Sequence, residues 1–223
     1  MDGKLFAQAL IKFLSGVLLV GLLLFPAAGT FAWPRAWLMM GVLFLPMLGA
    51  GIVLMRKNPE LLRRRLSARE EQPEQKRVIL LSGLMFVAAF LLAGLSFRFG
   101  WAVLPRWVSY GATVLFLLGY GLFAQVLREN TYLSRTVEVQ ADQKVIDTGL
   151  YGLVRHPMYM STLLLFLSMP LILGSILSFA VMLFYLPILG KRIQNEEQVL
   201  EAGLAGYADY KKRVKYKVIP HVW

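Results

Sequence analysis

Long apolar runs constrain this chain more than any other feature. Four of them, at roughly 5–28, 31–55, 78–97 and 107–127, are each long enough to cross about 30 Å of hydrocarbon as a helix. The composition agrees, because 57% of the 223 residues are hydrophobic and only 17% are charged. That is too apolar for one soluble domain of this length. The sequence therefore predicts an all-α integral membrane protein.

A fifth apolar run, from about 157 to 190, is too long for one membrane helix and too short for two ordinary ones. Pro170, Gly174 and Ser175 form a turn-forming cluster near its middle. We therefore expect this run to fold as a hairpin of two short helices. The chain would then have about six membrane segments.

The basic residues are distributed unevenly along the chain. Of the 24 Lys and Arg residues, 2 lie at positions 4 and 12, 8 between 56 and 77, 4 between 128 and 155 and 7 from 191 onward. Only Arg35, Arg98 and Arg106 lie in the alternate loops. Because basic loops tend to stay in the cytoplasm, we expect both termini and the basic loop 56–77 on that side.

The remaining composition excludes several classes of function. The basic segments account for the formal net charge of +11. No soluble domain remains that could bind nucleic acid. A metal site is not expected, since the chain has no cysteine and only two histidines, His156 and His221. Transport is disfavoured because the membrane segments carry almost no ionisable residues. The first apolar run is also longer than the core of a typical cleaved signal peptide.

Two polar segments flank the expected hairpin. The first, from 128 to 156, contains alternating Val137, Val139 and Val145, which suggests an extended connector. The second follows the hairpin, and its apolar spacing predicts a helix that ends near Gly203. In "GYGLFA", at 119–124, the glycines are better explained by close helix packing than by dinucleotide binding.

The hairpin brings the inner ends of these polar segments to the same membrane face. Arg155 and His156 stand at its entry, and Arg192, Glu196 and Glu197 follow its exit. The next residue after His156 is a proline, which suits the first turn of a helix, so His156 should lie at or just before the helix N-terminus. We expect a polar pocket at the cytoplasmic interface, suited to a charged, amphipathic cofactor.

Each of these signals has an ordinary alternative. An Arg-His pair before a membrane helix can be a headgroup anchor, and Arg192 with Glu196 can be a surface pair at i,i+4. The tyrosines near the two polar segments can form an aromatic belt at the membrane interface. The combination of cations, carboxylates and aromatics on both sides of one hairpin favours a site.

The combined motif resembles a known family. "TGLYGLVRHPMYMS", followed after the hairpin by "RIQNEEQVLEAGLAGYADYKKRV", is similar to the isoprenylcysteine carboxyl methyltransferase family and its phospholipid methyltransferase relatives. The resemblance covers 128–223, and it implies a methyltransferase region made of the connector, the hairpin 157–190 and a cytoplasmic C-terminal tail. Residues 1–127 would then form N-terminal membrane helices. Members of this family bind S-adenosylmethionine in a pocket built by these parts, without a Rossmann domain.

The resemblance also implies roles for individual residues. Arg192 and Glu196 would be catalytic, at the methyl-transfer end. Glu197 would bind a polar part of the cofactor or brace the fold. The other residues expected to bind the cofactor are Tyr151, Arg155, His156, Pro157, Tyr159, Tyr207 and Tyr210. The chain departs from the family pattern at Ala205, where Phe is common, and at Gly152, where Arg or Lys is common.

The implied reaction is methyl transfer from S-adenosylmethionine to a lipid-linked or amphipathic acceptor, most simply a carboxylate. Such a reaction needs positioning more than a strong base, and the planar guanidinium of Arg192 can pair with a carboxylate. Glu196 would orient Arg192, or accept a proton if the acceptor were an amine, as in phospholipid N-methyltransferases. Membrane sterol reductases, which use NADPH, share the R-H-P-x-Y element and are the alternative. The expected partners are the bilayer and a lipid-like substrate, with no nucleic acid and no metal.

Overall fold

The computed structural model describes residues 3–66, 73–133, 137–140 and 142–223. These residues fold mainly into helices, and the four long apolar runs form four long helices, as predicted. The order is α1 (Gly3–Ala28), α2 (Pro34–Lys57), α3 (Pro59–Leu66), α4 (Pro73–Phe99), α5 (Arg106–Glu129), the short 3-10 helix η1 (Gly149–Gly152), α6 (Pro157–Leu173), α7 (Ile176–Met182), α8 (Tyr185–Gly203) and α9 (Tyr207–Arg213).

Within the described residues, five helical stretches are long and apolar enough to cross a membrane: α1, α2, α4, α5 and the combined α7–α8 stretch. The sixth apolar helix, α6, has 17 residues and is shorter than a usual span. The chain is therefore a multi-pass integral membrane protein. Four helices, α2, α3, α4 and α6, begin at a proline, whose missing N–H is not needed in the first turn.

The fifth apolar run reverses direction between α6 and α7. Gly174 has a φ of +79°, in the left-handed region that favours glycine. Its N–H donates to the carbonyl of Leu171 at 3.1 Å, and the N–H of Ser175 donates to that of Pro170 at 3.0 Å. The Ser175 hydroxyl then accepts from the N–H of Ser178 and begins α7. The reversal thus lies at Gly174 and Ser175, whereas Pro170 lies inside α6.

The second arm of the hairpin is interrupted between α7 and α8. Pro187 has no N–H to donate to the carbonyl of Leu183, so the regular helical hydrogen bond cannot form there. The N–H of Leu186 donates to that carbonyl instead, at 3.0 Å. Beyond this break α8 continues to Gly203, where the apolar spacing predicted its end.

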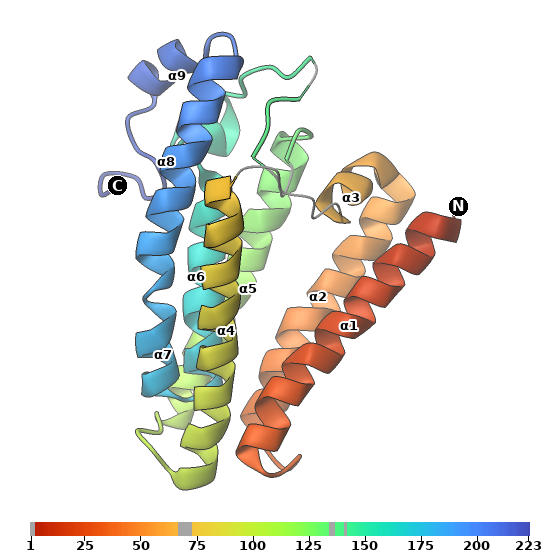
Figure 1. Ribbon diagram of the computed structural model, residues 1–223, viewed down its shortest axis with the longest axis vertical. Coiled ribbons are helices and arrows are strands. Elements are labelled where there is room, and N and C mark those ends of the chain that lie inside the picture. The colour runs from red at the N-terminus through yellow and green to blue at the C-terminus, as the bar shows by residue number, and fades with distance from the viewer. Residues whose placement is uncertain (1–2, 67–72, 134–136, 141) are drawn as a thin grey trace.

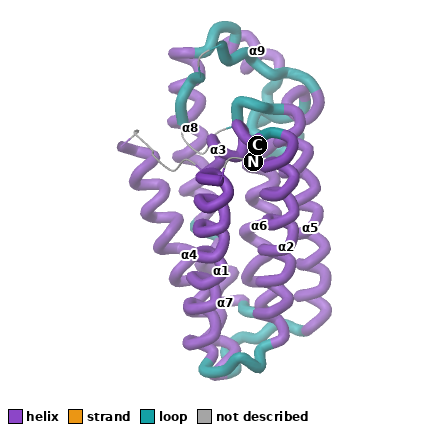
Figure 2. Tube along the Cα trace, turned by 90° about the vertical axis from the view of Figure 1, so that its right-hand side faces the viewer, coloured by secondary structure: helices purple, strands orange, loops and turns teal. Residues whose placement is uncertain are grey.

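Figure 1 shows α4, α5, α6 and α8 running side by side, while α1 and α2 lean away from them toward the end where α3 lies. Figure 2 shows most of the connecting segments, together with α9, gathered at that same end. At the opposite end α1 meets α4 closely, because a Cβ on Gly94 would lie 2.6 Å from the Cβ of Ala27. Gly119 likewise lets α5 approach Leu164 of α6, whereas Gly121 has nothing within 4 Å.

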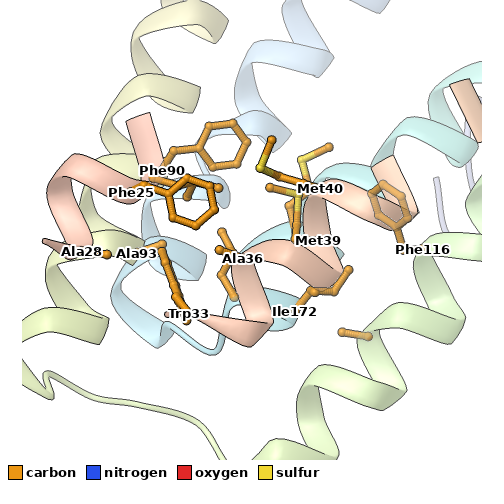
Figure 3. Packing of buried hydrophobic residues seen from close by; sticks show 14 of the residues in the cluster. Phe25, Ala28, Trp33, Ala36, Met39, Met40, Phe90, Ala93, Phe116 and Ile172 are labelled. Atoms are coloured by element: carbon orange, nitrogen blue, oxygen red, sulfur yellow. The ribbon is translucent and has the colours of Figure 1, made fainter. Parts of the chain in front are cut away.

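The largest cluster of buried apolar side chains joins α1, α2, α4, α5 and α6. Figure 3 shows Phe25, Trp33, Met39 and Phe90 packed within it. By contrast, large apolar side chains along the outer face of α1, such as Leu18, stay exposed. Such exposure is expected for a helix surrounded by lipid. The cluster fixes one end of the helices and leaves the polar segments to build the other.

Candidate active site

The entry of the hairpin is bound to the C-terminal tail. His156 directly precedes α6, and Pro157 is its first residue, as predicted. The backbone N–H of Arg155 donates to the carbonyl of Tyr216 at 2.9 Å, and that of His156 donates to the carbonyl of Lys217 at 2.8 Å. The tail therefore packs directly against the R-H-P element.

The buried carboxylate of Glu197 lies next to this contact between the hairpin entry and the tail. Glu197 accepts through Oε1 from Arg155 Nε at 2.8 Å and lies 3.1 Å from His156 Nε2. Arg155 Nη1 also donates to the carbonyls of Val214, at 2.7 Å, and Lys215, at 2.9 Å. Arg155, His156 and Glu197 are only 6%, 5% and 4% exposed, so the buried Arg155–Glu197 ion pair is completed by His156 and by the carbonyls of the tail.

Tyr159 connects the two residues expected at the methyl-transfer end. Its ring stacks on that of His156 with centroids 5.6 Å apart. Its hydroxyl donates to the carboxylate of Glu196 and accepts from Arg192 Nε at 2.9 Å. The phenol of Tyr159 thus lies between Arg192 and Glu196, whereas the sequence suggested that Glu196 orients Arg192 directly.

Gln75 of α4 also belongs to this group, and the sequence reasoning missed it. Its Oε1 accepts from Arg192 Nη1 at 3.0 Å. Its Nε2 donates to the carbonyl of Arg192, at 3.3 Å, and to Asn195 Oδ1, at 2.7 Å. Gln75 is fully buried and shares the buried face of α4 with Val78 and Met85. A polar residue on an otherwise apolar stripe was the signal that could have revealed it.

Three tyrosines form another wall. Tyr151 accepts from Asn130 Nδ2 at 2.9 Å, and Tyr210 donates to the carbonyl of Tyr151 at 2.7 Å. Tyr207 is different, because its hydroxyl is buried and has no hydrogen-bond partner within the described residues. Burial, together with the nearby carboxylates of Glu197 and Glu196, raises the pKa of Tyr207 well above its ordinary value. The phenol is therefore a protonated donor that a bound molecule could satisfy.

These side chains meet in one pocket between the connector, α6, α8 and α9. Its cavity volume is about 100 Å³, and all the space between the atoms, open solvent included, is about 860 Å³. Eight of the ten predicted site residues line it: Tyr151, Arg155, His156, Tyr159, Arg192, Glu196, Tyr207 and Tyr210. The other two, Pro157 and Glu197, support this wall from within α6 and α8.

The connector supplies further lining that the motif did not indicate. Asn130, Glu138 and Lys144 come from this segment and line the same pocket. The pocket therefore offers charges of both signs beside several aromatic rings. In the described part of the chain, no group of three or more His, Asp or Glu side chains is arranged to hold a metal ion.

The fold and the pocket define a class of protein: a multi-pass membrane protein with a polar small-molecule pocket, built from a helical hairpin and the polar segments on either side of it. Residues 112–202 match the model of the Isoprenylcysteine carboxyl methyltransferase (ICMT) family. This is the family that the motifs of the chain resemble, and the match includes the R-H-P-x-Y element and the residues from Arg192 to Glu197.

Two relatives extend this comparison. The solved structure of the eukaryotic intramembrane Ras methyltransferase ICMT is similar in fold, with a TM-score of 0.58 and 21% identity over 92% of this chain and 74% of that one. The Delta(14)-sterol reductase TM7SF2 of Mus musculus is 31% identical over 91 residues. That match covers 40% of this chain and only 22% of the reductase, so the chain corresponds to about a fifth of that relative.

Proposed function

We propose that this protein transfers a methyl group from S-adenosylmethionine to a lipid-linked or amphipathic acceptor at the cytoplasmic membrane face. The observation that supports this most is the pocket itself. Residues that the family resemblance assigns to one site come from the connector, α6, α8 and α9 and line a single pocket. The match of residues 112–202 to the family model supports the same reaction class.

The chemistry of the lining fits this cofactor. S-adenosylmethionine would supply an electrophilic methyl group on a positively charged sulfur. The faces of Tyr151 and Tyr159 suit a cation or an adenine ring, and the unpartnered hydroxyl of Tyr207 can donate to a polar group. Lys144 and Glu138 offer charges of opposite sign for an amino-acid moiety. A nucleotide-sized molecule would fill the open mouth of the pocket as well as its narrow part.

Arg192 would orient the acceptor. A carboxylate brings its own lone pair and loses no proton, so its reaction depends on orientation rather than on a base. Two groups restrict the guanidinium of Arg192, Tyr159 at Nε and Gln75 at Nη1. Glu196 acts on Arg192 through the phenol of Tyr159. With an amine acceptor, as for a phospholipid N-methyltransferase, Glu196 would instead accept the proton.

A second candidate is an NADPH-dependent reductase of the sterol type. The 31% identity to a sterol reductase over 91 residues favours it, as does the shared R-H-P-x-Y element. Calorimetry on the purified protein separates the two proposals. We expect S-adenosylmethionine and its demethylated product to bind, and NADPH not to bind. Binding of NADPH alone would replace the methyltransferase proposal with the reductase.

A further inference from the structure

A second cavity lies at the opposite end of the helices from the candidate active site. It measures about 550 Å³ and lies between α2, α4, α5 and the turn of the hairpin. Trp33, Arg35, Arg106 and Tyr110 form its polar lining, and side chains such as Leu38 and Phe97 form its apolar lining. A cavity of this size can hold a small molecule or part of a lipid.

The charges around this cavity have one sign. The segments that form this end, 28–36, 96–110 and 170–178, contain no Asp or Glu. Arg35 and Arg106 are close enough to repel each other electrostatically, and no carboxylate in the described residues forms an ion pair with either of them. Arg35 is partly buried and Arg106 is exposed. An anion bound between them would offset their mutual repulsion.

Trp33 provides an independent indication of a ligand. It lines the cavity and is fully buried, and its indole Nε1–H has no acceptor in the described part of the chain. The ring cannot easily turn to find one, because it stacks on Phe97 with centroids 4.8 Å apart. Buried indole donors normally have a partner. Here that partner would be an acceptor oxygen of a molecule in the cavity.

The positions of the arginines suit a phosphate group. Arg106 is the first residue of α5, and Arg35 lies in the first turn of α2, where the helix dipoles also favour an anion. Arg35 is held against the hairpin turn, since a Cβ on Gly174 would lie 1.8 Å from its Nη1. Guanidinium groups bind phosphate oxygens through paired hydrogen bonds.

We propose that this cavity binds the phosphate of an anionic lipid headgroup at the membrane face opposite the candidate active site. A lipid is favoured over free phosphate because the cavity combines cations with an apolar wall. Exposed aromatic side chains, Trp107 and Tyr110, also lie at the start of α5, where aromatics commonly meet the headgroup layer. This proposal is independent of the reaction at the other end.

Lipid binding to the purified protein tests it. Delipidated protein in neutral detergent is titrated with short-chain phosphatidylglycerol, phosphatidylcholine or inorganic phosphate, and bound molecules are counted by native mass spectrometry. We expect phosphatidylglycerol to bind saturably and more tightly than the other two. R106Q should weaken this binding about tenfold, as expected for the loss of a charge-assisted hydrogen bond. Trp33→Phe, which removes the indole N–H, should weaken it severalfold.

Arg98→Gln is the matched control. Arg98 lies at the same end but does not line the cavity, and its guanidinium packs 5.4 Å from the Phe99 ring centroid. This variant should change phosphatidylglycerol affinity less than about twofold, since only a diffuse surface charge is lost. Equal losses of phosphatidylglycerol affinity in R106Q and R98Q would overturn the proposal. Phosphatidylcholine or inorganic phosphate binding as tightly as phosphatidylglycerol would also overturn it. An unchanged unfolding midpoint of R106Q in denaturing detergent would show that its fold is intact.

Discussion

At the scale of single residues, a substitution of Arg192 tests whether this residue acts in the proposed methyl transfer rather than in cofactor binding. Its side chain contacts Tyr159 and Gln75 through different nitrogens, and a lysine ammonium cannot reproduce both contacts together with a paired acceptor. We expect Arg192→Lys to lower turnover on the order of a hundredfold and to change cofactor affinity less than about twofold. Turnover assays and calorimetry on the same preparations measure the two effects.

Arg192→Lys should have almost no effect if Arg192 lies outside the site. If Arg192 were only a surface partner of Glu196, the substitution would cost about 0.2–0.5 kcal/mol. A lysine variant that turns over at the normal rate would therefore remove Arg192 from the site.

Removing the hydroxyl of Tyr207 tests whether this group contacts the cofactor in the pocket. Because this hydroxyl has no partner within the described residues, Tyr207→Phe should leave the unfolding free energy nearly unchanged. It should weaken cofactor binding by about 1 kcal/mol if the bound cofactor accepts from it. Tyr210→Phe is the control, since the Tyr210 hydroxyl donates to the carbonyl of Tyr151 and its loss should lower stability. Calorimetry measures the cofactor affinity of the two variants, and detergent-induced unfolding measures their stability. An unchanged cofactor affinity in Tyr207→Phe would place that hydroxyl outside the site.

At the scale of elements, Glu197 joins α8 to the hairpin entry and the tail. Glu197→Gln leaves Arg155 buried without its carboxylate, which typically costs about 3–5 kcal/mol. The tail should detach first, because Arg155 also binds the carbonyls of Val214 and Lys215. Limited proteolysis of the tail and unfolding in denaturing detergent measure the effect.

Glu201 is the matched control for Glu197. It lies one helical turn further along α8 and pairs with Lys211 at 2.7 Å, but both side chains are more than a third exposed. Glu201→Gln should therefore change stability by less than about 1 kcal/mol. Similar losses of stability in Glu197→Gln and Glu201→Gln would contradict the view that Glu197 holds the tail against the hairpin entry.

The hairpin turn depends on one glycine. Gly174→Ala places a Cβ at a positive φ, which costs about 1–2 kcal/mol, and it also displaces the Arg35 guanidinium. Gly190→Ala, inside α8 with nothing within 4 Å of the added carbon, should be neutral or stabilise by about 1 kcal/mol. Unfolding midpoints in denaturing detergent compare the two. Equal midpoints would mean that the turn tolerates an ordinary residue.

At the scale of the whole molecule, the prediction concerns orientation. The polar segments and the candidate pocket share one end of the helices (Figure 1), and 21 of the 24 basic residues belong to the segments predicted to be cytoplasmic. Reporter fusions at residues 70, 140 and 223 should all report the cytoplasm, and a fusion at residue 103 should report the other side. Residue 70 lies outside the described residues, so this arm tests a sequence prediction alone. An external signal at 223 would contradict the proposed cytoplasmic location of the pocket.

Much of the architecture could be predicted because it depends on local properties. The lengths of apolar runs predicted α1, α2, α4 and α5, and Pro157 and Gly203 predicted where α6 begins and α8 ends. The motif residues near the hairpin predicted eight of the residues that line the pocket. Each of these inferences uses residues that are neighbours in sequence or that belong to one recognisable pattern.

Other features were decided only by the tertiary structure. Gln75 contacts Arg192 across 117 positions of the chain, and Tyr159 lies between Arg192 and Glu196. The cavity beside Arg35 and Arg106 is lined by residues from three turns that are far apart in sequence, at Trp33, Val103 and Gly174. Apolar periodicity tells which face of a helix is buried, but the rotation and register of one helix against another depend on how all their side chains pack together. The sequence by itself therefore determined the four long apolar helices and the membrane setting, and packing determined which polar groups meet.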